Sequence, residues 1–127
     1  MASLPWIDFL RLHPGAHLVV GIVVPVPGSS HLMRLRRLLN DVIAGQSPQG
    51  VFSTALVRQT GKTEIHCGFA AQADADRFAR TVKAKRIGRP DTGRAGEWAS
   101  EHSFRLTPAS ELALSGALAA RGEAAQR

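Results

Sequence analysis

The chain has 127 residues, of which 44% are hydrophobic and 20% are charged, values typical of one globular domain. The longest apolar run, Leu18 to Val26, is about half the length that a membrane-spanning helix needs. The first residues lack the basic and apolar regions of a secretory signal. A single cysteine, Cys67, excludes an internal disulfide and sites built from several thiolates. We therefore expect a cytoplasmic protein that does not enter a membrane and uses neither a metal nor a cofactor.

The charge balance is basic, with 16 Lys and Arg against 10 Asp and Glu and a formal net charge of +6. Most of these cations are arginines. A positive net charge favours contact with polyanions such as nucleic acid. A solvated basic surface has the same composition, so the charge leaves both interpretations open.

Residues 3–13 form a short amphipathic segment that we expect to be helical. Ser3 is placed to cap it, and Pro5 falls in its first turn, where a missing N–H costs nothing. Trp6, Phe9 and Leu10 share one face, which we expect to lie against the body of the fold.

Residues 17–25 are apolar at both odd and even positions, a pattern typical of a central strand that is covered on both sides. A helix follows, capped by Ser29 or Ser30 and running to about Ala44, where Gly45 ends it. Its apolar residues recur at three- and four-residue steps and predict one buried stripe: Leu32, Leu35, Leu39, Val42 and Ile43.

Residues 51–69 read as a β-hairpin with a two-residue turn at Thr60-Gly61. This turn pairs Leu56 with Ile65, Thr54 with Cys67 and Phe52 with Phe69. A turn at Gly61-Lys62 would shift these partners by two residues and keep the same side-chain faces. Alternation then sorts the hairpin into two faces. The face with these residues is apolar and is expected to lie under the helices. The opposite face is compact and nearly uncharged, and it carries Val51, Ser53, Ala55, Val57, Glu64, His66 and Gly68.

The remaining sequence predicts a helix over Gln72 to Lys85, an irregular connection over 87–97 and a fourth strand over Trp98 to Leu106. Thr107-Pro108 is a good start for a last helix, which we expect to reach about Ala120. Residues 122–127 are expected to form a flexible tail.

These elements predict an α+β fold in a single domain, 1–127, with its core at about 16–107. The inner order β, α, β, β, α, β matches the ferredoxin-like βαββαβ plan. That plan implies a four-stranded antiparallel sheet with two helices on one face. The N-terminal segment 3–13 and the C-terminal helix 107–120 add to it. Because the plan serves many unrelated functions, it does not identify one.

Self-association is the first functional hypothesis. Ferredoxin-like subunits often pair through an open sheet face, and the outer face of the hairpin is small enough for close approach by a second subunit, a terminal segment or a ligand. We expect a homodimer whose interface contains Ser53, Ala55, Val57, His66 and Gly68.

Binding of nucleic acid or another polyanion is the second hypothesis. Arg34, Arg36 and Arg37 lie largely off the buried stripe of their helix and are able to touch phosphates. The connection 86–94 is rich in Gly and Arg, so its backbone and side chains suit an anion. The predicted contact residues are Arg34, Arg37, Arg86, Arg89 and Arg94. Phe69 shares parity with Ile65 and faces the core, so no base-stacking platform like that of RNA-recognition domains is expected.

A small enzyme is the third hypothesis, with His66 in a pocket as in ferredoxin-like monooxygenase or isomerase dimers. His66 is the one weak catalytic candidate. Its neighbour Cys67 points to the other face of the strand, so the two side chains cannot form a thiolate–imidazole pair. No histidine spacing is typical of a metal site.

Overall fold

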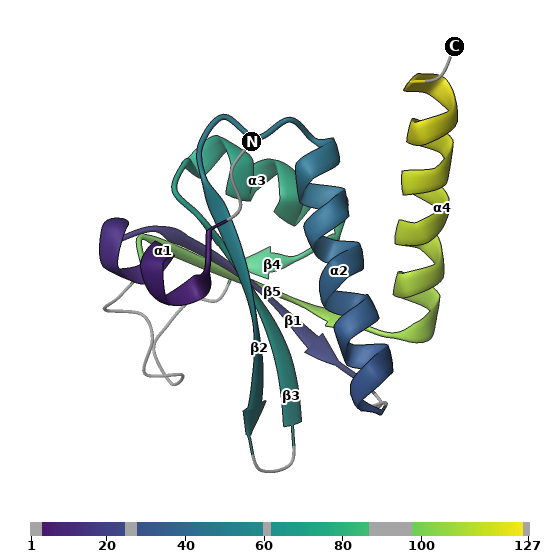
Figure 1. The fold of residues 1–127 in the computed structure, drawn as a ribbon, viewed down its shortest axis with the longest axis horizontal. Coiled ribbons are helices and arrows are strands. Elements are labelled where there is room, and N and C mark those ends of the chain that lie inside the picture. Colours follow the sequence, from purple (N-terminus) through teal and green to yellow (C-terminus); the bar gives the residue numbers. More distant parts are fainter. Residues whose placement is uncertain (1–3, 25–27, 60–61, 87–97, 126–127) are drawn as a thin grey trace.

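The computed structural model describes residues 4–24, 28–59, 62–86 and 98–125. Figure 1 shows one sheet with α2 and α3 on one face, α1 on the other, and α4 beside α2. The strand order is β2-β3-β1-β5-β4. The elements in chain order are α1 (Trp6–Leu12), β1 (His17–Val23), α2 (Ser29–Gly45), β2 (Phe52–Gln59), β3 (Lys62–Phe69), α3 (Gln72–Thr81), β4 (Lys85–Arg86), β5 (Ser100–Leu106) and α4 (Pro108–Ala125).

The hairpin of β2 and β3 has the predicted register, with Phe52 opposite Phe69, Thr54 opposite Cys67 and Leu56 opposite Ile65. The turn residues 60–61 lie outside the described ranges. Ile65 and Cys67 are fully buried on the side of α2 and α3. The prediction that alternate hairpin residues separate into a helix-covered face and an outer face is therefore confirmed for the residues described.

β1 is the central strand, as predicted, and it is buried on both sides. Val19 and Val23 belong to the core under α2 and α3. Leu18 and Val20 point to the opposite face and are at most 1% exposed. A strand that is covered on both faces has no polar side to alternate with, which explains its continuous apolar sequence.

The expected four-stranded antiparallel sheet is wrong. The sheet has five strands, and β5 runs parallel to β1 with Gly21 opposite Phe104. The reason is the short strand β4, which pairs antiparallel with β5 at the outer edge. The chain leaves α3 through β4 first and returns as β5, so β5 enters the sheet in the direction opposite to that of the ferredoxin-like plan.

α3 ends at Thr81, although the sequence predicted a helix to Lys85. Lys83 adopts a left-handed conformation with φ of 57°. The N–H of Lys83 donates to the carbonyl of Arg80 at 3.2 Å, and the N–H of Ala84 donates to that of Ala79 at 2.8 Å. These two bonds form a Schellman motif, which usually has glycine at the left-handed position. Because the residue there is a lysine, the sequence does not mark this helix end. Lys85 and Arg86, which follow it, form β4.

The ends of the other long helices differ less from expectation. The residue before α2 is Gly28, and neither Ser29 nor Ser30 caps it because both lie within the helix. Thr107 caps α4 as predicted, since the N–H of Ser110 donates to its Oγ1 at 3.2 Å. α4 then continues to Ala125, past the expected end at Ala120 and into the segment expected to be a flexible tail.

α1 covers part of the outer sheet face. Phe9 is fully buried there, whereas Leu10 is 42% exposed, so the prediction that Leu10 faces the body is wrong. Two further bonds fix the entry to α1. The N–H of Leu4 donates to the carbonyl of Phe52 at 3.0 Å, and Ser53 Oγ donates to the carbonyl of Leu4 at 2.5 Å. Across the described ranges, every helix falls short of the length and apolar character that crossing a membrane requires.

Candidate anion-binding site

A pocket of about 390 Å³ lies between α2 and the edge strand β2. Met33, Arg36, Arg37 and Asn40 recur at three- and four-residue steps, so they project from one side of α2. That side flanks the buried leucines of the helix, and Arg36 and Asn40 on it are half-buried. The residues that line the pocket are Met33, Arg34, Arg36, Arg37, Asn40 and Thr54.

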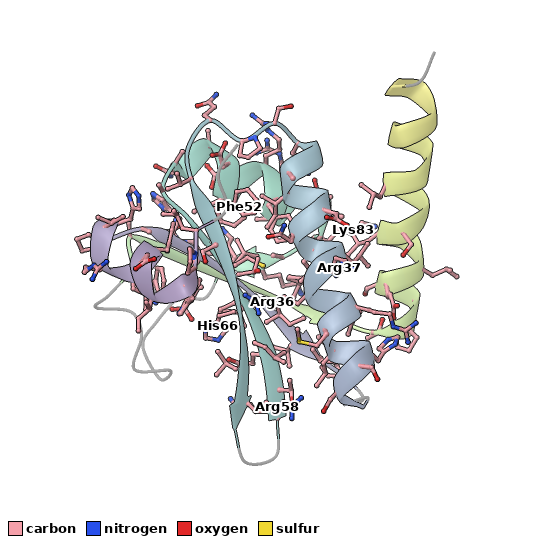
Figure 2. The ribbon with its side chains drawn as sticks, in the orientation of Figure 1. Arg36, Arg37, Phe52, Arg58, His66 and Lys83 are labelled. Carbon is pink, nitrogen blue, oxygen red and sulfur yellow. The ribbon has the colours of Figure 1, made fainter. Side chains whose placement is uncertain are left out.

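Arg36 is the cation of this pocket that bonds to the sheet. Its Nε donates to Thr54 Oγ1 at 3.2 Å, and its Nη2 donates to the Thr54 carbonyl at 2.8 Å. Figure 2 shows Arg36 on the side of α2 that faces β2. One edge of the guanidinium is thus held by the sheet. Among the described residues, no acceptor is bonded to Nη1 on the other edge, where two N–H groups form the fork that matches a phosphate or a carboxylate.

The bonds from Arg36 also close part of the free edge of β2. Alternate residues of an edge strand direct both backbone groups away from the sheet. The outward carbonyl of Thr54 is occupied by Arg36, and that of Phe52 is occupied by the N–H of Leu4. Unpaired edges invite association with other strands. Arg36 therefore has a structural role that is independent of any ligand.

The positive charge of the pocket is not neutralised by the part of the chain that the structure describes. In those ranges no ion pair includes Arg34, Arg36 or Arg37. Arg34 Nη2 instead donates to His31 Nδ1 at 3.2 Å, and His31 Nε2 donates to Glu111 Oε1 at 2.8 Å. For Arg34 to donate to it, Nδ1 of His31 must be the acceptor nitrogen, with the ring proton on Nε2.

The positive charge of Arg36 also affects Cys67, which lies in the core under α2. Burial raises the pKa of the Cys67 thiol to about 12, and the nearby Arg36 charge opposes this shift only in part. The thiol is completely buried and protonated at neutral pH. Cys67 is thus a core side chain and does not act as a nucleophile.

The structure brings together only part of the predicted polyanion site. Arg34 and Arg37 line the pocket, whereas Arg86 lies on β4, at the other edge of the sheet from β2. Arg89 and Arg94 lie outside the described residues. The predicted set omitted Arg36, although its spacing from Met33 and Asn40 on the helix was a signal that could have identified it.

The predicted dimer interface is partly occupied by the chain itself. Ser53 is fully buried and bonds to the Leu4 carbonyl, and Gly68 lies under the rings of Trp6 and Phe9. Ala55 and Val57 remain half-buried. Of the three occupants that the sequence allowed for this face, the terminal segment is the one observed over Gly68. Self-association through Ala55 and Val57 stays a prediction.

His66, the weak catalytic candidate, is 7% exposed on the outer face. Its Nε2 bonds to Glu64 Oε1 at 2.9 Å, and the ring of Trp6 meets it edge-on with centroids 6.2 Å apart. Lys62 Nζ lies 3.7 Å from Glu64 Oε2. A carboxylate that orients an imidazole is a usual part of a general base. However, His66 lines neither the α2 pocket nor three further hollows of the described residues.

Metal ligation has no support in the ranges that the structure describes, since they contain no group of three His, Cys, Asp or Glu side chains able to hold an ion. Comparison of the chain with protein-family models, with curated proteins and with solved structures found no match. A function for this protein must therefore be inferred from the geometry of the α2 pocket.

Proposed function

We propose that the protein binds nucleic acid through the phosphate backbone, with Arg34, Arg36 and Arg37 of α2 as the contact residues. The observation that carries this proposal is the Arg36 guanidinium, which Thr54 holds on one edge and which opens on the other into a pocket of about 390 Å³. A guanidinium that is fixed before binding loses less side-chain entropy when it meets a phosphate. Arg34 and Arg37 add charge beside it.

The exposed residues favour phosphate contacts over base contacts. In the described ranges, the large apolar side chains that are exposed are all aliphatic: Ile7, Leu10, Leu12, Met33 and Leu112. Proteins that recognise single-stranded bases stack them on aromatic rings. Without such rings near the α2 pocket, binding is expected to depend little on base sequence and strongly on salt.

Fluorescence anisotropy with a labelled, mixed-sequence single-stranded oligonucleotide tests this proposal. The logarithm of the association constant should fall linearly with the logarithm of the salt concentration, by about 0.7 for each phosphate neutralised on a single strand. Arg36→Gln should weaken binding and lower this slope. Arg36→Lys should restore the slope but not the full affinity, because lysine is a point charge without the fork of donors.

Arg11→Gln is the matched control. It removes the same charge from α1, on the other face of the sheet, where Arg11 is exposed and pairs with Asp8 at 3.0 Å. If Arg11→Gln and Arg36→Gln reduce the affinity equally, the protein attracts nucleic acid by net charge alone and the α2 site is wrong. Absence of binding at low salt would end the proposal altogether.

A further inference from the structure

A second hollow lies on the helix-side face of the sheet, beside β5 and the unpredicted strand β4. α2 contacts β2, and α3 contacts β1 and β3, so these two helices cover one part of the sheet. β5 and β4 extend the sheet beyond α3. The result is a hollow of about 300 Å³ at the end of α3. It is lined by Asp76, Ala79, Arg80, Lys83, Ala84 and His102.

His102 is the unusual group in this hollow. Its Nδ1 is buried and has no hydrogen-bond partner among the described residues. Buried polar atoms are nearly always hydrogen-bonded, so such an atom beside a cavity indicates a bond to a ligand or a bound water. Burial lowers the pKa of His102, with further lowering by Arg86 and His17 and an opposing effect of Asp76. The imidazole is therefore neutral at physiological pH, and each nitrogen has one role, as donor or as acceptor.

The charges around the hollow are arranged by sign along α3. Asp76 lies near His102, Arg80 follows one turn later on α3, and Lys83 lies two residues beyond the end of the helix. A helix rises about 1.5 Å per residue, so Asp76 and Arg80 are separated by roughly 6 Å along the axis. In the ranges that the structure describes, none of these three charged side chains is in an ion pair. Opposite charges thus line one cavity.

We propose that this hollow binds a small zwitterion, a molecule with an ammonium group and a carboxylate joined by a short apolar linker. Arg80 and Lys83 receive the carboxylate, and Asp76 receives the ammonium group. The neutral imidazole of His102 supplies one further hydrogen bond. The methyl groups of Ala79 and Ala84 leave room for a narrow linker. This site is separate from the α2 pocket and does not depend on nucleic-acid binding.

Titration of the full chain, followed by ¹H–¹⁵N NMR, tests the site. The probes are glycine, β-alanine and 4-aminobutyrate, which place the two charges at increasing distance, with acetate and methylammonium as single-charge references. At least one amino acid should cause saturable shifts at Ala79, Ala84 and His102, with a dissociation constant at least about tenfold lower than that of acetate, a difference of about 1.4 kcal/mol. Equal affinity for acetate, or no saturable shift, would overturn the proposal.

Two substitutions separate the ends of the site. Asp76→Asn should remove the preference for the amino acid over acetate, and Lys83→Asn should weaken both, since asparagine tolerates the left-handed backbone at position 83 without the charge. Arg105→Gln is the control, because Arg105 lies on β5 with His102 but is exposed on the opposite face of the sheet. If Asp76→Asn keeps the preference, or if Arg105→Gln has the effect of Lys83→Asn, the assignment is wrong.

Discussion

Phe9 lies directly on the backbone of Gly68. A β-carbon added at Gly68 would be 2.6 Å from Phe9 Cε2 and 3.1 Å from Trp6 Cζ3. Both distances are shorter than an ordinary van der Waals contact between carbon atoms. The absence of a side chain at position 68 is therefore what allows α1 to pack on the outer face of β3.

Gly68→Ala is expected to destabilise the protein by about 1–3 kcal/mol, because an overpacked contact forces the rings of Phe9 and Trp6 to move. Urea unfolding followed by tryptophan fluorescence measures this change. Gly116→Ala on α4 is the control, since, apart from its chain neighbours and the backbone of its own helix, no described atom lies within 4 Å of its added β-carbon. It should stabilise the protein by up to about 1 kcal/mol through helix propensity. A Gly68→Ala protein as stable as the parent would show that α1 does not pack as described.

Lys83→Gly is expected to raise the free energy of unfolding by about 1 kcal/mol. Lys83 holds the left-handed position of the Schellman motif, which costs a residue with a β-carbon about 1–2 kcal/mol and glycine almost nothing. The larger unfolded-state entropy of glycine offsets part of this gain. Arg80→Gly, inside α3, should have the opposite sign. Destabilisation by both substitutions would contradict the end assigned to α3.

Asp74→Ala is expected to destabilise the protein by about 2–3 kcal/mol, because two backbone donors would lose a charged acceptor. Asp74 is 3% exposed, and its two carboxylate oxygens accept from the N–H groups of Gln49 and Gly50, both at 2.9 Å. Asp76 lies two residues further along α3, and no bond from it to a backbone N–H is seen among the described residues. Asp76→Ala should therefore change stability by less than about 1 kcal/mol. Similar losses from the two substitutions would mean that the Asp74 bonds contribute little.

Cys67 should make stability depend on pH in the alkaline range. Its pKa is raised by burial from 9.0 to about 12, so the folded state keeps a proton that the unfolded state loses. The contribution is complete below pH 9.0 and is lost as pH rises toward about 12. In Cys67→Ala this part of the decline should be absent, and unfolding curves at several pH values measure the difference. Rapid modification of native Cys67 by a thiol reagent at pH 8 would contradict its burial.

Local patterns were sufficient for the parts of the fold that depend on near neighbours. The two faces of the hairpin followed from alternation, and its register matched one of the two turn positions that the sequence allowed. The double burial of β1 followed from its composition. The direction of β5 could not be predicted in this way, because it depends on how β4 pairs after a long connection. The end of α3 was missed because Lys83 occupies a position that glycine normally marks.

The candidate site was predictable only in part for a similar reason. Helical spacing places Arg36 beside Arg37 and Asn40, but its importance depends on Thr54, a residue on another element. That long-range contact separates a guanidinium fixed at a sheet edge from an ordinary solvated arginine. Sequence spacing alone treats the two as equal.

The side-chain Nε–Hε signal of Arg36 offers the most direct test of nucleic-acid binding by α2. It can be followed by ¹H–¹⁵N NMR while a mixed-sequence single-stranded oligonucleotide is added at low salt. We expect this signal and the amide signals of Met33, Arg37 and Asn40 to shift together and saturate, while those of α1 stay in place. Shifts confined to other elements, or a signal of Arg36 that does not move while the oligonucleotide binds, would contradict the proposed site.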